Sequence, residues 1–270
     1  MPYFKNKTAI VTGSSMGIGK TIALELCKQG ANVVLNGRNV GRLEKTHQEF
    51  LQKGFNVIAV QADVTKITDC DELIQKTIAS YGKIDILVTN AGIIISERFE
   101  NIQPEIFARV IESNIYGSAF PAFKALPYIK NTKGSIVFIS SVAGMIGLPT
   151  ASAYSAGKMA LTALAQSLKI ELTGSGVHIG IVHVGFTQND ADKRVINGKG
   201  ELILVAQRPV YLQQTQKQVA KAVLTTIRKR KFKSTPSIIG KLNSYLVRFF
   251  PGLVMRIIAA SQKRMEKMYK

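Results

Sequence analysis

The chain has few of the residues that build disulfide frameworks and metal sites. Its two cysteines, Cys27 and Cys70, lie in helix-like segments without a CxxC pattern, so we expect buried free thiols and a reducing compartment. Its three histidines, His47, His178 and His183, are not spaced as metal ligands, and we expect no metal site. No signal-peptide apolar segment precedes the first strand-like run, which predicts a cytoplasmic protein.

Acidic residues are also scarce. The chain has 17 Asp and Glu against 36 Lys and Arg, a formal net charge of +19. Residues 1–185 hold 18 basic and 13 acidic residues (net +5), whereas residues 186–270 hold 18 and 4 (net +14). The excess charge therefore belongs to the last third, for which we expect an acidic partner. An anionic membrane surface ranks ahead of nucleic acid, because no recognised motif or aromatic–basic platform accompanies the charge.

The 270 residues have the hydrophobic content (46%) and the alternating pattern of one globular α/β domain. Apolar runs suited to strands cover residues 8–12, 32–36, 56–61, 84–89, 135–140 and 177–184. Amphipathic stretches suited to helices cover residues 18–29, 40–53, 69–81, 104–130 and 151–173. Most of these strands are apolar on both faces, which is typical of a parallel sheet covered by helices on each side. The pattern predicts a single-domain, Rossmann-type doubly wound parallel sheet flanked by helices.

A glycine-rich loop joins the first expected strand to the first expected helix. Gly13 suits a tight turn, Gly17 lets the backbone approach a pyrophosphate, and Gly19 allows close helix packing, while the helix N-terminus offers free N–H groups. Three glycines also suit an ordinary turn, but their place between a buried strand and an amphipathic helix favours dinucleotide binding. The loop residues expected to contact the cofactor are Gly13, Ser14, Ser15, Gly17, Ile18 and Gly19.

Two further positions bear on the cofactor. Arg38 follows the second strand, where an acid would bind a ribose 2′-OH and favour NAD(H). Its guanidinium suits a 2′-phosphate, so we expect NADP(H); the alternative is a solvated loop arginine without a ligand. Asp63, followed by Val64, closes the third strand, and its carboxylate suits the adenine amino group. The alternative for Asp63 is a turn aspartate at the start of a helix.

Tyr154 and Lys158 lie four residues apart in an expected helix, so their phenol and ammonium share one face. At roughly 4–5 Å and an effective dielectric near 20, the attraction between an ammonium and a phenolate is about 3–4 kcal/mol. That corresponds to roughly 2–3 pKa units, enough to bring a tyrosine from about 10 toward neutrality. A phenol tuned in this way can pass a proton to or from a carbonyl or alcohol oxygen.

Together these motifs resemble the short-chain dehydrogenase/reductase family over roughly residues 5–190. The TGxxxGxG loop is matched at residues 12–19, the Asn-Ala-Gly motif at 90–92, and the Ser-Ser-x-Ala-Gly strand end at 140–144. The loop after the sixth strand departs from the family, because Val184 stands where proline is common. The resemblance implies further cofactor contacts from Asn90, Ala91, Gly92, Gly185, Phe186 and Thr187.

The resemblance also implies four catalytic residues. Ser141, thirteen residues before Tyr154, would orient the substrate oxygen, and Tyr154 would donate the proton. Lys158 would lower the tyrosine pKa and hold the nicotinamide ribose, and Asn114 would anchor a water that links Lys158 to solvent. These roles predict an NADP(H)-dependent oxidoreductase that interconverts a ketone and a secondary alcohol, acting on an apolar or lipid-like substrate. The alternative is a catalytically silent NADP-binding scaffold or regulator at a membrane surface.

Residues 1–190 are thus expected to form the dinucleotide-binding and catalytic core, and residues 191–270 a substrate loop and basic extension of the same domain. Within the extension we expect a covering loop with some helix at 193–212, a helix at 213–230 and a final strand near 234–239. The apolar stretch 242–258 contains two arginines and a proline, which argues against a spanning helix.

Two interpretations of this tail remain open. Its apolar side lies in a lipid interface on the inner face of a membrane, which we favour slightly, or it packs on the core or on a partner copy. Such enzymes are usually oligomeric, and the long helices at 104–130 and 151–173 offer a face for a homo-oligomer, at least a dimer.

Overall fold

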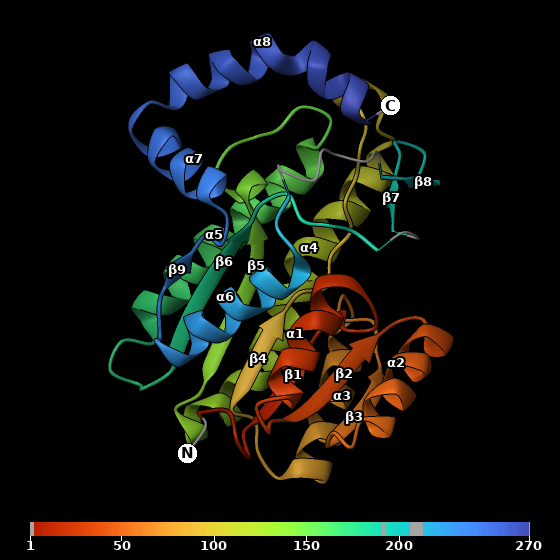
Figure 1. Ribbon diagram of the computed structural model, residues 1–270, viewed down its shortest axis with the longest axis vertical. Helices are drawn as coiled ribbons and strands as arrows, with labels where there is room; N and C mark the ends of the chain where they lie inside the picture. Colours follow the sequence, from red (N-terminus) through yellow and green to blue (C-terminus); the bar gives the residue numbers. More distant parts are fainter. Residues whose placement is uncertain (1–2, 191–192, 206–212, 270) are drawn as a thin grey trace.

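The computed structural model describes residues 3–190, 193–205 and 213–269. Its centre is a seven-stranded sheet in the order β3-β2-β1-β4-β5-β6-β9, in which every paired neighbour is parallel (Figure 1). The strands are β1 (Thr8–Val11), β2 (Asn32–Gly37), β3 (Val57–Gln61), β4 (Ile86–Thr89), β5 (Ser135–Ser141), β6 (His178–Val184) and β9 (Lys233–Ser234). The order runs outward from β1 to β3, then returns and runs the other way from β4, as in a doubly wound sheet.

Helices cover both faces of the sheet. They are α1 (Gly17–Cys27), α2 (Val40–Gln52), α3 (Ile67–Tyr81), α4 (Pro104–Thr132), α5 (Ser152–Glu171), α6 (Gln216–Arg228), α7 (Ile238–Phe249) and α8 (Pro251–Tyr269). One core lies under α1, α2 and α6, and the other under α3, α4 and α5. Successive strand residues alternate between them, since Ala9 and Val11 pack in the first core and Ile10 in the second. The expected single-domain doubly wound fold is confirmed.

The segment after β6 differs from the expectation of some helix at 193–212. Its described part forms an antiparallel hairpin of β7 (Arg194–Ile196) and β8 (Leu202–Leu204), while residues 206–212 lie outside the described residues. Apolar residues on both sides of an Asn-Gly-Lys-Gly turn favour strands here, and Gly200 supplies a left-handed conformation with φ of 82°.

The final strand was also expected too far along the chain. β9 ends at Ser234, and the remainder of the expected strand turns into α7. Pro236 has no N–H for a sheet ladder, and the Ser237 hydroxyl accepts a hydrogen bond from the Gly240 N–H at 3.0 Å, which caps the helix. Among the described residues, no helix combines the length and apolarity needed to cross a bilayer.

Candidate active site

A cleft of about 790 Å³ opens at the carboxyl ends of the central strands, where the strand order reverses. Ligands of open α/β sheets bind at this point. Eighteen of the nineteen predicted site residues line it, and only Ser14 does not. Those lining the cleft are Gly13, Ser15, Gly17, Ile18, Gly19, Arg38, Asp63, Val64, Asn90, Ala91, Gly92, Asn114, Ser141, Tyr154, Lys158, Gly185, Phe186 and Thr187.

Ser14 was expected to contact the cofactor, but its side chain is buried against β2. The Asn36 N–H donates to the Ser14 hydroxyl at 2.9 Å, and the Ser14 N–H donates to the Asn36 carbonyl at 2.8 Å. Both polar groups therefore hold the glycine-rich loop on the sheet, and the side chain does not face the cleft.

At two positions of the loop, neighbouring atoms lie so close that only glycine fits. Gly13 has φ of 62°, and a Cβ there would lie 2.9 Å from the Ala91 Cα. A Cβ on Gly19 would lie 2.3 Å from the Gly13 carbonyl oxygen. Asn90 braces the same loop, because its amide donates to the carbonyls of Thr12 and Gly13, both at 3.1 Å. The loop is therefore held at the start of α1 by packing that only glycine allows.

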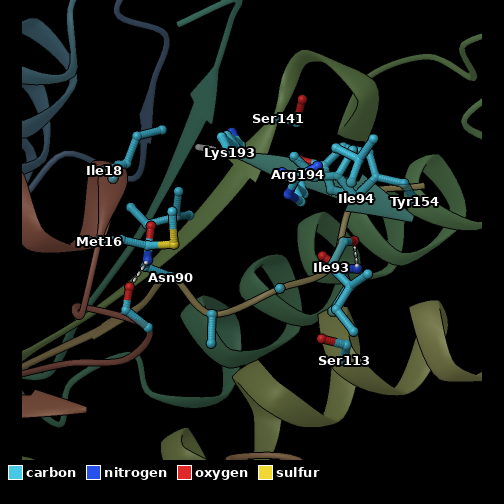
Figure 2. A pocket seen from close by; sticks show the side chains of 18 of the residues that line it. Met16, Ile18, Asn90, Ile93, Ile94, Ser113, Ser141, Tyr154, Lys193 and Arg194 are labelled. Carbon is cyan, nitrogen blue, oxygen red and sulfur yellow. Dashed lines mark hydrogen bonds between the residues drawn. The ribbon is translucent and has the colours of Figure 1, made fainter. Parts of the chain in front are cut away.

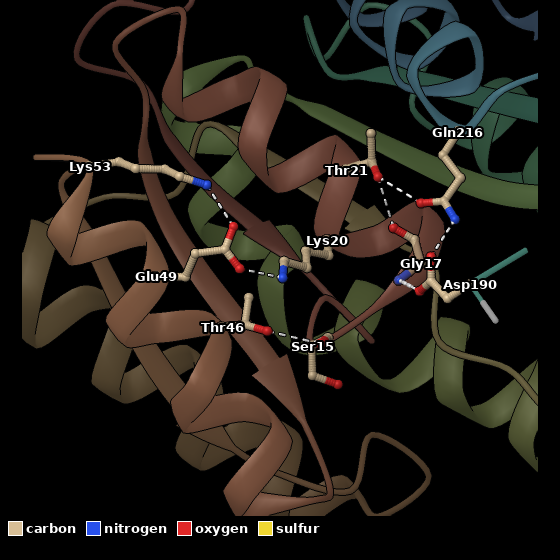
Figure 3. Close-up of polar contacts among 9 residues, drawn as sticks. All are labelled: Ser15, Gly17, Lys20, Thr21, Thr46, Glu49, Lys53, Asp190 and Gln216. Atoms are coloured by element: carbon tan, nitrogen blue, oxygen red, sulfur yellow. Dashed lines mark hydrogen bonds and ion pairs between the residues drawn. The ribbon is translucent and has the colours of Figure 1, made fainter. Parts of the chain in front are cut away.

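An unpredicted carboxylate lies at the N-terminus of α1. The Gly17 N–H donates to one Asp190 oxygen at 2.9 Å, and the Gln216 amide donates to the other at 2.8 Å (Figure 3). Gln216 is held in turn by the Thr21 hydroxyl, which donates to its amide oxygen at 2.8 Å. The carboxylate thus takes the position in which a helix N-terminus binds an anionic group such as a phosphate. Asp190 is distant from Gly17 in sequence, so no local pattern could have identified the pair.

Two guanidinium groups flank the far end of the cleft, beyond β2. Arg38 is about half exposed, and its Nη1 lies 3.6 Å from an Asp63 carboxylate oxygen. Arg42, which sequence reasoning missed, lies in the first turn of α2 and also lines the cleft. Partial burial opposes ionisation of Asp63, but its pKa is still lowered, because Thr65 donates two hydrogen bonds and Arg38 is nearby. This end of the cleft is therefore cationic and exposed.

The opposite end carries Tyr154 and Lys158 on α5, one turn apart as expected. The Lys158 ammonium lies 5.6 Å from the centre of the Tyr154 ring and donates to the Ile139 carbonyl at 3.0 Å. Burial lowers the pKa of Lys158 from 10.5 to about 8. Ser141 ends β5 beside them, and its hydroxyl accepts a hydrogen bond from the Ala143 N–H at 3.2 Å. Figure 2 shows Ser141 and Tyr154 across the cleft from Met16 and Ile18.

Asn114 lies behind this group on α4. Its amide nitrogen donates to the carbonyls of Ile93 at 2.8 Å and Val110 at 2.9 Å. Its buried amide oxygen makes no hydrogen bond with any residue that the structure describes. A Cβ on Gly92 would lie 2.7 Å from this oxygen and 3.5 Å from the Lys158 ammonium, so both groups face the same small space. An acceptor and a donor so placed suit a bridging water.

Apolar side chains pack beside Tyr154, and Lys193 and Arg194 also line this part of the cleft (Figure 2). Tyr154 packs with a small cluster that includes Ile95 and Ile196, and the hairpin contributes Ile203 to the lining. Gly185, Phe186 and Thr187 line the cleft on the β6 side. The site thus joins a cationic end, a glycine-rich loop and an apolar pocket with one phenol. In the described residues, no three His, Cys, Asp or Glu side chains gather as a metal site would require.

The family profile and the related proteins found by comparison agree on one family. The family profile described as short chain dehydrogenase matches residues 7–199. The 11-beta-hydroxysteroid dehydrogenase 1A of Arabidopsis thaliana is 37% identical over 201 residues, which are 73% of this chain and 57% of that protein. The chain therefore spans just over half the length of the curated relatives it matches.

Two solved structures share the fold. A short chain dehydrogenase/reductase from Burkholderia phymatum in complex with NAD superposes with a TM-score of 0.82 at 22% identity, covering 94% of this chain and 96% of that chain. A dehydrogenase/reductase from Sinorhizobium meliloti 1021 is 30% identical with a TM-score of 0.75, covering 86% of this chain and 93% of that chain.

Proposed function

The chain belongs to the short chain dehydrogenase family, and we propose that it is an NADP(H)-dependent oxidoreductase that interconverts a ketone and a secondary alcohol. The observation that carries this proposal is the convergence of Ser141, Tyr154 and Lys158 at one end of a cleft whose floor is the glycine-rich loop. The loop and the N-terminus of α1 would hold the pyrophosphate, and Lys158 the nicotinamide ribose. When bound, the cofactor supplies the hydride.

The residues of the chain supply the proton and its control. Tyr154 donates its phenolic proton to the carbonyl oxygen as that oxygen becomes an alcohol. The ammonium of Lys158 stabilises the resulting phenolate by about 3 kcal/mol, taking the 5.6 Å to the ring centre and an effective dielectric near 20. Because the pKa of Lys158 is about 8, its charged form prevails at neutral pH. Ser141 donates a hydrogen bond to the same substrate oxygen and so fixes its position.

Asn114 provides a route for replacing that proton. Its unpaired amide oxygen and the Lys158 ammonium face one space, which supports a water that passes protons from solvent to Lys158 and on to Tyr154. The apolar side chains beside Tyr154 support an apolar substrate, and the hydroxysteroid in the name of the Arabidopsis relative is a compound of that kind.

The preference for NADP(H) rests on the cationic end of the cleft. Arg38 and Arg42 line it where a 2′-phosphate would lie, and no acidic residue ends β2. The Burkholderia structure holds NAD, so the family fold alone does not decide between the cofactors. We expect Arg38→Ala to weaken NADPH binding by roughly 10- to 100-fold, since hydrogen bonds to charged groups contribute about 1.5–3 kcal/mol. NADH binding is the internal control, and tighter binding of NADH than NADPH by the wild type would remove this assignment.

A panel of ketones assayed for NADPH oxidation tests the activity itself. We expect turnover with apolar ketones and faster turnover with NADPH than with NADH. Tight NADPH binding without turnover of any ketone or alcohol would instead favour a silent scaffold, and binding of neither nucleotide would overturn both.

We also propose a homodimer formed through α4 and α5. Phe123 on α4 and Ile170 on α5 are large apolar side chains that are more than two-thirds exposed. Phe123→Glu should shift the mass measured by light scattering toward the monomer. Val40→Glu, at an exposed position of α2, should leave the mass unchanged. An identical mass for all three proteins contradicts this interface.

A further inference from the structure

The two last helices carry an apolar face that nothing in the described part of the chain covers. On α7 the exposed side chains Leu242, Tyr245 and Phe249 recur at the spacing of one helix face. Leu253 and Ile257 do the same on α8, and Phe250 immediately precedes that helix. All six are between 52% and 68% exposed, and both helices lie at one end of the molecule, away from most of the sheet (Figure 1). An apolar area of this kind marks an interaction site.

The sequence that forms this face is strongly basic. Residues 202–265 contain 13 Lys and Arg and no Asp or Glu. Lys241, Arg248 and Arg256 lie exposed on the same two helices, and the Arg248 guanidinium lies 5.7 Å from the centre of the Phe249 ring. Long basic side chains beside apolar ones are the composition of helices that lie in a lipid–water interface.

A basic pocket adjoins the apolar face. It has a volume of about 520 Å³ and lies between α6, β9 and α7. Four lysines line it, Lys221, Lys231, Lys233 and Lys241, and no acidic residue does. Its hydroxyl groups are supplied by Thr225, Ser234, Thr235, Ser244 and Tyr245. Tyr245 belongs to both the pocket and the apolar face, so a bound anion would lie next to the exposed apolar side chains.

The pocket lacks a counter-charge of its own. The Lys233 ammonium donates to the Ser244 hydroxyl at 3.1 Å, and the pKa of Lys233 is lowered, first by burial and then by the nearby Arg248. Lysine ammonium groups and hydroxyl groups together are the donors that bind a phosphate. An anionic ligand would therefore relieve the repulsion among these side chains.

We propose that this basic–apolar surface, formed by the exposed faces of α7 and α8 and the four-lysine pocket, docks the protein on a bilayer of anionic phospholipid. The pocket binds a headgroup phosphate, and the six apolar side chains enter the boundary between headgroups and acyl chains. A second copy of the chain is a poorer occupant, because it would bring like charges together without acidic partners. The surface serves attachment and is separate from the catalytic cleft.

Sedimentation with vesicles of phosphatidylcholine, with and without phosphatidylserine, tests this proposal on the full-length protein. We expect the wild type to sediment with the anionic vesicles and to stay in solution with the neutral ones. Each lysine near an anionic surface contributes a several-fold factor, so Lys233→Gln combined with Lys241→Gln should weaken binding by roughly 10- to 30-fold. The matched control, Lys5→Gln combined with Lys45→Gln, removes the same charge from exposed positions elsewhere and should bind within about twofold of wild type.

Tyr245→Ser combined with Phe249→Ser tests the apolar part, and NADPH binding verifies that each variant is folded. This variant should lose vesicle binding while its mass in light scattering stays that of the wild type. Equal sedimentation with neutral and anionic vesicles, equal weakening by the control pair, or a wild type that stays in solution overturns the proposal. A fall in mass on loss of the apolar pair would assign the face to a second copy instead.

Discussion

Replacing Asp190 with asparagine should tighten the binding of NADPH. In the structure the Asp190 carboxylate accepts the Gly17 N–H at the start of α1 and is held there by Gln216. Under the proposed function this N–H and the helix N-terminus receive the cofactor pyrophosphate. The phosphate must therefore displace a carboxylate from the same donor before it binds.

The size of the effect follows from that contact. A hydrogen bond to a charged group contributes about 1.5–3 kcal/mol, and a negative charge at a helix N-terminus about 0.3–1 kcal/mol. Asparagine keeps an oxygen that can accept from Gly17 but loses the charge, so about 1–2 kcal/mol of competition should disappear. This corresponds to a roughly 5- to 30-fold lower Kd.

Fluorescence titration of NADPH into the wild type and Asp190→Asn measures this Kd. Glu201→Gln is the matched control, because it neutralises an exposed carboxylate in the neighbouring hairpin that bonds to Asn197 and not to α1. We expect the control to bind NADPH as the wild type does. An unchanged or higher Kd for Asp190→Asn would refute the idea that the carboxylate competes with the cofactor.

The structure predicts the effects of two further substitutions. Lys158→Met should stabilise the protein without nucleotide by up to about 3 kcal/mol near pH 7, because the lysine pKa falls from 10.5 in the unfolded chain to about 8 on burial. The cost of burying the charged lysine is full below pH 8 and vanishes as the pH rises toward 10.5. Urea unfolding near pH 10 should therefore show a smaller gain in stability from Lys158→Met than near pH 7. An equal gain at both pH values would contradict the lowered pKa of Lys158. Gly19→Ala should weaken NADPH binding and lower the unfolding temperature, since its Cβ would lie 2.3 Å from the Gly13 oxygen. Gly41→Ala, where a Cβ meets nothing closer than 3.8 Å, should do neither, and the same loss in both variants would exclude the close-packing explanation.

The doubly wound sheet could be predicted because its signal is local. Strands such as β2 and β6 carry apolar, buried residues on both faces, and the helices between them have their own periodicity. The placement of Tyr154 and Lys158 on one helix face follows equally from a spacing of four residues. Family motifs brought Ser141 and Asn114 into the same prediction.

The parts that could not be predicted depend on contacts between distant segments. Asp190 and Gly17 are 173 positions apart in the sequence but hydrogen-bonded in the fold, and nothing in the sequence near either residue predicts the contact. The burial of the Ser14 side chain against β2 could not be predicted, because the sequence around a loop serine is similar whether it faces a ligand or a strand. The hairpin of β7 and β8 was missed, and the final strand was expected near residues 234–239 although β9 is Lys233–Ser234, because brief apolar runs suit a strand or a helix equally.

Single-turnover oxidation of bound NADPH by a ketone, compared between the wild type and Tyr154→Phe, tests the proposed proton donor most directly. We expect the rate to fall by roughly 10²- to 10⁴-fold, the usual contribution of a positioned acid, while the Kd of NADPH changes by no more than about twofold. A Tyr154→Phe rate within about tenfold of the wild type would contradict the assignment of the phenol beside Lys158 as the acid.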